Sequence, residues 1–168
     1  MTTLEINQKN IQDIFKDILK SLSEKEKDVI EKRIWLNWEK QTLQSIWNSF
    51  TPNITRERDR QIEDSWIKKI GRIIKATILV EIQEFAKKIL DEHGWLLTKD
   101  KLVNAIIKWY DIQNEMNSSI IETIVQSDYD IVKSKPKLGT VSYFYLPKIA
   151  KKQIDMIHKE ALNILSIN

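Results

Sequence analysis

An arginine-rich segment of this 168-residue chain carries the side chains best suited to chemistry. Thr55 is followed by the run RERDRQ, which places four polar side chains in the first two turns of a predicted helix: Arg56, Arg58, Arg60 and Gln61. A guanidinium group can donate two parallel hydrogen bonds to a guanine edge. Thr55 is a suitable N-cap, because its hydroxyl can accept from the free N–H groups of the first turn. The pattern is typical of a helix that reads bases in the major groove of DNA.

The residues before this helix predict the other half of a helix-turn-helix. Apolar side chains recur at helical spacing between residues 42 and 50, at Leu43, Ile46, Trp47 and Phe50. The sequence TPN at residues 51–53 then favours a turn, since proline fixes φ. An alternative interpretation of the arginine-rich helix start is a solvated surface with intrahelical ion pairs among Arg56, Asp59, Arg60 and Glu63.

Further lysines could bind the DNA backbone. Lys68, Lys69, Arg72 and Lys75 continue the predicted helix, although a solvated basic face explains them equally well. No Asp or Glu occurs between Ile131 and Ile154, and three lysines of this window fall in the loop of a predicted hairpin: Lys133, Lys135 and Lys137. Such a loop could contact the backbone or the minor groove. Alternatively, these lysines protect the strand edges from aggregation.

Composition favours a folded domain, because 42% of the residues are hydrophobic and 30% are charged. A net charge of +3 permits nucleic-acid binding without requiring it. The absence of cysteine excludes disulfides and thiolate zinc sites, and it favours a reducing, cytoplasmic compartment. No apolar run approaches the roughly 20 residues of a membrane span, and the N-terminus lacks a signal-peptide pattern. We therefore expect no membrane partner.

No pattern of an enzyme is present. The sequence has no phosphate-binding loop, GxSxG, HExxH or dinucleotide fingerprint. His93 and His158 are isolated and do not have metal-site spacing, so they are expected to be a helix C-terminal cation and a surface residue. Most of the six tryptophans lie at apolar-periodic positions and are predicted core residues. The sequence thus predicts no catalytic residue, no cofactor and no metal.

Apolar periodicity predicts a mainly α-helical fold. One helix is expected from about residue 4 to residue 20, and a second follows Ser23, where Glu26 completes a capping box, and runs to about Trp38. After Thr55 the apolar period continues as far as Gly94. Either one helix spans 55–93, or a break near Gly71 or Thr77 separates two helices. A break near Thr77 is favoured, because globular helices rarely exceed about 25 residues.

The second half predicts a small α+β module. The expected order is a helix over 81–93 that ends at Gly94, a strand at 95–97, a helix that Thr98 caps, a helix from residue 117 or 118 to 125, and a hairpin with strands near 129–133 and 141–146. This is the element order of a winged helix. In the run Tyr143–Tyr145, core packing of some side chains is favoured over base stacking. Pro147 is expected at the first position of a last helix that reaches about Ile164.

These elements predict three parts: an N-terminal helix over 1–20, a helix-turn-helix domain over 21–76, and a winged-helix-like domain with a β-hairpin and C-terminal helix over 77–168.

Residues 21–75 resemble region four of bacterial sigma-70-family factors, which reads the −35 promoter element and docks on RNA polymerase. The run ITRERDRQIE at residues 54–63 matches the family pattern V/I-T-R-E-R-I/V-R-Q-I-E except at Asp59, and LSEKEKDVIEKR at residues 22–33 looks like the family's opening pattern. The resemblance implies DNA contacts from Arg56, Glu57, Arg58, Arg60 and Gln61, with Glu57 accepting from a cytosine amino group. It also implies that the helix end capped by Thr55 can face a phosphate.

Two departures affect this resemblance. Three residues separate Phe50 from Ile54, where the family usually has one, and Asp59 replaces an apolar residue. Because an unpaired buried acid is costly, Asp59 is expected to be exposed or paired with an arginine. No segment resembles sigma region two, so the resemblance implies a separate sigma-like subunit for promoter melting. Residues 81–146 resemble, more loosely, winged-helix modules of the HARE-HTH kind.

The leading hypothesis is a sequence-reading duplex DNA-binding protein of the bacterial-type transcription machinery, which can also dock on RNA polymerase. The alternative is a protein-interaction adaptor that keeps the helix-turn-helix fold without DNA readout. Residues 21–64 favour this alternative, because they hold eight Lys and Arg against nine Asp and Glu. A third hypothesis is an accessory domain of a nucleic-acid enzyme.

Overall fold

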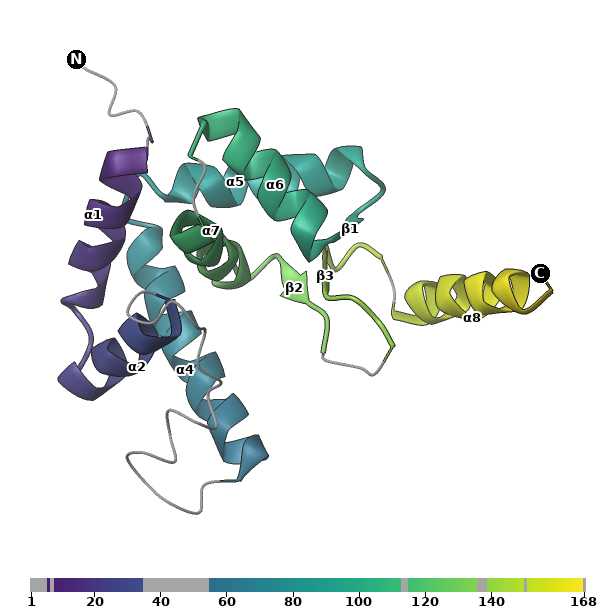
Figure 1. Ribbon diagram of the computed structural model, residues 1–168, viewed down its shortest axis with the longest axis horizontal. Helices are drawn as coiled ribbons and strands as arrows, with labels where there is room; N and C mark the ends of the chain where they lie inside the picture. The colour runs from purple at the N-terminus through teal and green to yellow at the C-terminus, as the bar shows by residue number, and fades with distance from the viewer. Residues whose placement is uncertain are drawn as a thin grey trace.

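The computed structural model describes residues 6, 8–34, 55–112, 115–135, 139–149 and 151–167 (Figure 1). These residues form seven helices and a three-stranded antiparallel sheet, so the predicted mainly α-helical class with a small β part is confirmed. The predicted helix at 42–50 and the turn at 51–53 lie outside the described residues. No described helix is both long enough and apolar enough to span a membrane.

The N-terminal helices follow their local signals. Helix α1 (Gln8–Leu19) begins later than predicted and buries Ile11, Phe15 and its neighbours at helical spacing. Helix α2 (Glu24–Ile34) begins with the predicted capping box. The Glu26 backbone N donates to Ser23 Oγ at 3.3 Å, and the Ser23 backbone N donates to the Glu26 carboxylate at 3.1 Å. Two backbone donors at this helix start are thereby satisfied.

The predicted break near Thr77 is confirmed. Helix α4 (Arg56–Ile74) and helix α5 (Val80–Glu92) are separated by a turn over residues 75–79. The Thr77 hydroxyl donates to the Ile74 carbonyl at 2.9 Å and accepts from the Leu79 N–H at 3.2 Å. These bonds replace the helical ladder at the point where the chain turns. At the other end of α5, Gly94 has φ +74°, and the Trp95 N–H bonds the Leu90 carbonyl at 2.7 Å, as expected of a glycine C-cap.

The sheet has the order β1–β3–β2, with β1 (Leu96–Thr98) and β2 (Val132–Lys133) both antiparallel to β3 (Tyr143–Tyr145). Between β1 and β2 lie α6 (Lys99–Tyr110), which Thr98 caps as predicted, and α7 (Glu115–Gln126), which begins before the predicted Asn117. The hairpin strands are shorter than expected. Phe144 is fully buried, as predicted for part of the aromatic run.

The prediction for Pro147 was wrong. Helix α8 begins only at Lys151 and extends to Ile167. Pro147 instead occupies the second position of a turn, in which the Ile149 N–H donates to the Leu146 carbonyl at 3.1 Å. Proline suits this position because its fixed φ matches that of the turn.

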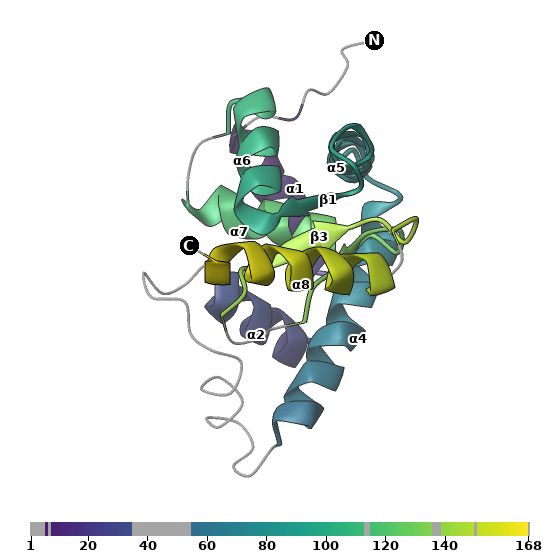
Figure 2. The same cartoon turned by 90° about the vertical axis from the view of Figure 1, so that its right-hand side faces the viewer.

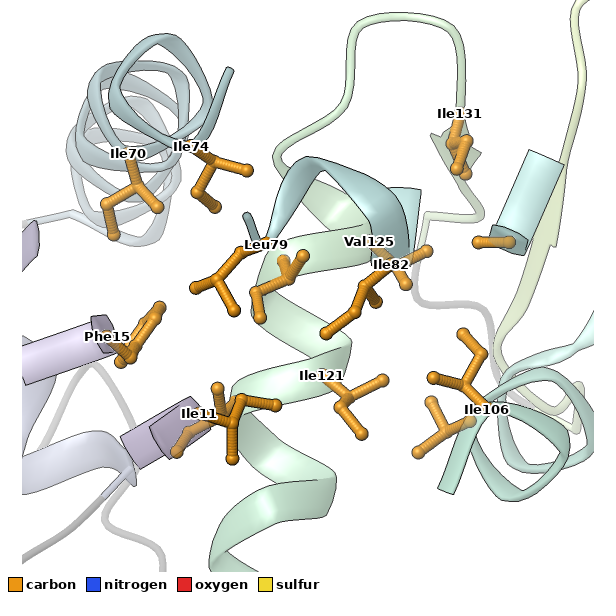
Figure 3. Packing of buried hydrophobic residues seen from close by; sticks show 14 of the residues in the cluster. Ile11, Phe15, Ile70, Ile74, Leu79, Ile82, Ile106, Ile121, Val125 and Ile131 are labelled. Carbon is orange, nitrogen blue, oxygen red and sulfur yellow. The ribbon is translucent and has the colours of Figure 1, made fainter. Parts of the chain in front are cut away.

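Helix α7 lies at the centre of the core (Figure 3). Its residues Ile121 and Val125 belong to one buried cluster with Ile11 and Phe15 of α1 and with Ile70 and Ile74 of α4. Gly71 lets α4 pack directly against the backbone that follows α7, because a Cβ added at Gly71 would lie 2.2 Å from the Ser127 carbonyl oxygen. The predicted domain boundary after residue 76 falls in the α4–α5 turn, and the buried cluster continues across it.

Two of the three described tryptophans contradict the prediction that tryptophans are core residues. Trp66 is buried, but Trp95 is 38% exposed and Trp109 is 69% exposed. The Trp95 indole N–H donates to the Asp91 carboxylate at 3.0 Å. The Trp109 ring lies against Phe85, with centroids 5.0 Å apart, at the outer face of α5 and α6. Trp109 was predicted in a helix and Trp95 in an apolar strand, but only the packing of neighbouring elements decides which of these positions are covered.

Candidate nucleic-acid interface

The N-terminal half of α4 extends beyond the body of the molecule (Figures 1 and 2). The C-terminal half is anchored by Trp66, Ile67 and Ile70, which are buried. Before these residues, the side chains of Glu57, Arg58, Arg60 and Gln61 are exposed. We call this free half, residues 55–64, the α4 tip.

Thr55 caps the α4 tip as predicted. Its backbone is extended, with φ −77° and ψ 155°, and its Oγ1 accepts from the Arg58 N–H at 3.2 Å. One of the four unpaired N–H groups of the first turn is thus satisfied, and the helix end keeps its positive electrostatic character. An anionic group at this end would therefore be stabilised.

The side chains of the α4 tip bond one another. Arg60 donates to both carboxylate oxygens of Glu57, at 2.7 and 3.2 Å, and to Asp64 at 3.4 Å. Arg58 donates to the Gln61 side-chain oxygen at 3.4 Å. Hydrogen bonding to Glu57 raises the pKa of Arg60, and the same hydrogen bond is the main cause of the lowered pKa of Glu57.

Intrahelical ion pairs are present at the α4 tip, as the alternative interpretation of this helix start suggested. Arg60 pairs with Glu57 and Asp64, and the pairs suggested for Arg56 and Asp59 fall on side chains that are not described. The side chains of Arg56 and Asp59 lie outside the described part of the structure, so the expected exposure or pairing of Asp59 stays a prediction. Since exposed ion pairs contribute little free energy, Arg60 can exchange these carboxylates for another acceptor at small cost.

The basic residues towards the C-terminal end of α4 fall into two groups, one in contact with neighbouring elements and one exposed. Lys69 forms an ion pair with Glu26 of α2, and Lys75 contacts the buried Asp128 after α7 at 3.3 Å. These two lysines tie α4 to its neighbours. Lys68 and Arg72 are exposed on the same helix and could bind phosphates.

The loop between β2 and β3 carries a further candidate basic group, Lys135, whose side chain is exposed. Its positive charge contributes to the lowered pKa of Glu57, after the larger effect of Arg60. Lys133 has a different position: its ammonium group contacts Glu122 of α7 at 3.0 Å and is half-buried. Lys137 lies outside the described residues. Of the three predicted loop lysines, Lys135 therefore best fits a backbone contact.

A groove of about 460 Å³ runs between this hairpin and the start of α8. Its walls include Lys133, Lys135, Tyr143 and His158. The Tyr143 and His158 rings meet edge to face, with centroids 5.8 Å apart. Burial is the main cause of the raised pKa of Tyr143. The groove thus combines cationic and aromatic groups beside the exposed lysine of the loop.

Helix α7, the third helix of the predicted winged-helix order, cannot enter a DNA groove without unpacking the core. Asn117, Ile120 and Ile124 are buried, and α1, α4, α5 and α6 all pack against α7. The sequence contained a signal for this, because residues 115–126 include no Lys or Arg. A DNA-reading helix normally needs basic residues for the phosphates on either side of the groove.

No group of three or more His, Cys, Asp or Glu side chains within the described ranges could hold a metal ion. Comparison with known proteins adds no further identification: no family model matches the chain, and no curated protein or solved structure is significantly similar to it.

Proposed function

We propose that this protein binds duplex DNA through the α4 tip, with Lys135 contacting the phosphate backbone beside it. The observation that carries the proposal is the solvent-facing Arg58 and Arg60 on a protruding helix end that Thr55 caps. The motif ITRERDRQIE, with its resemblance to the −35-reading helix of sigma factors, supports base readout by Arg56, Glu57 and Gln61 as well.

Binding would exchange ion pairs within the helix for contacts with DNA. Arg60 leaves Glu57 or Asp64 and donates to a guanine edge or a phosphate, and giving up the exposed ion pairs costs little free energy. Lys135 and the exposed Lys68 add charge that releases counterions from the DNA. The winged-helix-like half supplies the basic loop, while its third helix holds the core together. In the cell, we place this activity in the cytoplasm, with RNA polymerase or a sigma-like subunit as a further partner.

The proposal is tested by fluorescence anisotropy with labelled duplexes, using random sequences and sites selected from a random pool, at several salt concentrations. Arg58→Ala with Arg60→Ala should weaken binding at least about tenfold and reduce the salt dependence. Lys101→Ala with Lys108→Ala is the matched control, because it removes two positive charges from exposed positions on α6. The proposal fails if the protein shows no salt-dependent duplex binding, or if both pairs of substitutions have equal effects.

A second candidate function is that of a protein-interaction adaptor. The 69% exposed Trp109, stacked on Phe85, favours it, since tryptophan often dominates binding at protein interfaces. The pairing of Arg60 within its own helix is also compatible with a tip that does not contact DNA. Binding to purified RNA polymerase that Trp109→Ala abolishes, together with no affinity for DNA, would select this function.

A further inference from the structure

Helix α8 extends away from the sheet side of the molecule (Figure 1). Among the described residues, the α8 side chains that are buried or contact another ring lie in its first turns. Ile154 is buried, and the ring of His158 meets Tyr143. From Lys159 to Ser166 every side chain is exposed. The helix therefore has a short anchored part and a long free part.

The free part of α8 has an apolar stripe along one face. Its residues Ile157, Ala161, Ile164 and Leu165 follow the spacing i, i+4, i+7 and i+8, so they lie on one side of the helix, with Leu162 beside them. Ile157 is 57% exposed and Leu165 is 72% exposed. Lys152, Lys159 and Asn163 occupy the opposite face, and the stripe itself contains no charged residue.

An exposed apolar stripe on a short helix is expected to pack against another surface. Isolated helices of this length are only marginally stable in water, and most helical stability in proteins comes from the packing of an apolar face. The stripe is contiguous and lies on a projecting element, which distinguishes it from apolar residues scattered over a surface.

We propose that the stripe is a homodimer interface, in which the α8 helices of two copies of this chain pack against each other about a two-fold axis. An uncharged apolar stripe is self-complementary, as such an isologous contact requires. Complete burial of the exposed side chains of the stripe would remove at most about 500 Å² from each copy, and because the total of about 1,000 Å² is at the lower limit of a specific interface, we expect a weak dimer.

The position of α8 also allows the contact. In Figure 1 the helix extends away from the other elements, so a second helix can approach the stripe along the free part. The stripe contains neither Lys135 nor any residue of the α4 tip, so dimerisation and the proposed DNA binding rest on different residues and can be measured separately. A dimer would give each assembly two α4 tips.

Sedimentation equilibrium of the full chain over the micromolar range tests the proposal. The unmodified protein should form a dimer, and Leu165→Glu should weaken association at least about tenfold, because it places a charge in the apolar contact. Since Leu165 is exposed in the single chain, this variant should keep its fold, which circular dichroism can verify.

Met156→Glu is a matched control. Met156 is 61% exposed and lies nine residues before Leu165, which is two and a half helical turns and therefore the opposite face of α8. The dimer should persist in this variant. The proposal is overturned if the unmodified chain is monomeric throughout the range, if it forms only larger assemblies, or if the two substitutions weaken association equally.

Discussion

Two helices extend beyond the body of this protein, and they expose opposite kinds of surface. Helix α4 is anchored at its C-terminal half by Trp66 and Ile70, and its free tip is charged and internally paired. Helix α8 is anchored near its start by Ile154, and its free part carries the apolar stripe. Each helix thus has a part that packs on the body and a part that projects from it, but the projecting part of α4 is charged and that of α8 is apolar.

This difference predicts different partners. A charged tip is stable in water by itself, and its surface ion pairs can be exchanged for phosphates or base edges. An apolar stripe gains free energy mainly from the removal of water, and so it favours a protein surface. Three substitutions test this contrast: one in the anchored part of α4, one in the anchored part of α8 and one in the α4 tip. They are given in order of decreasing expected effect on the free energy of unfolding.

Gly71→Ala, in the anchored half of α4, should have the largest effect. The added Cβ would lie 2.2 Å from the Ser127 carbonyl oxygen, which belongs to the backbone and cannot move aside cheaply. We expect the free energy of unfolding to fall by about 3 kcal/mol, measured by chemical denaturation. Ser65→Ala, at an exposed position of the same helix, should change it by less than about 0.5 kcal/mol. An unchanged stability in Gly71→Ala would show that α4 is not held closely against the end of α7.

The sequence predicted those features that depend on neighbouring residues. The capping box of Ser23 and Glu26, the Thr98 cap and the Gly94 C-cap each require a few adjacent side chains, and all three are present. The break near Thr77 was also predictable, because a helix over 55–93 would have been unusually long. The cap at Thr55 belongs to the same class, so the start of the candidate interface could be located from the sequence alone.

Features that depend on tertiary packing were not predictable in the same way. Helical periodicity shows which face of α7 is apolar, but it does not show that other helices cover the remaining sides. Nor does it show that Lys133 contacts Glu122 while Lys135 is exposed. Exposure of Trp109 and of the α8 stripe depends on where neighbouring helices end. The partners of a side chain, more than its own type, decide whether it remains available for binding.

Ile154→Ala should have an intermediate effect, because it removes the anchor of α8. Ile154 is 3% exposed, and loss of such a side chain typically costs about 2 kcal/mol. The effect should be local, with faster hydrogen exchange in α8 and little change in α1 or α7. Met156→Ala, on the exposed face of the same helix, should leave exchange almost unchanged. Equal exchange rates in both variants would mean that α8 is held by contacts other than Ile154.

Glu57→Gln should have the smallest effect on stability and should sharpen the contrast at the α4 tip. Hydrogen bonding from Arg60 is the main cause of the lowered pKa of Glu57, so their ion pair contributes above the ordinary carboxyl pKa and is lost as pH falls through the lowered value. In Glu57→Gln, the free energy of unfolding should no longer depend on the titration of this carboxyl group at acid pH. Because the ion pair is exposed, we expect almost no change in the free energy of unfolding at neutral pH.

The same substitution separates two roles of Glu57 in DNA binding. It releases Arg60 from its closest carboxylate and removes a negative charge from the tip, so affinity for random duplex should rise about threefold. If Glu57 also accepts from a cytosine amino group, as the resemblance to sigma region four implies, affinity for a selected site should fall at the same time. Anisotropy with both kinds of duplex measures the two effects. A loss of affinity for random duplex would mean that Glu57 holds Arg60 in the geometry that binds DNA, and the ion pairs of the tip would then be part of the binding surface.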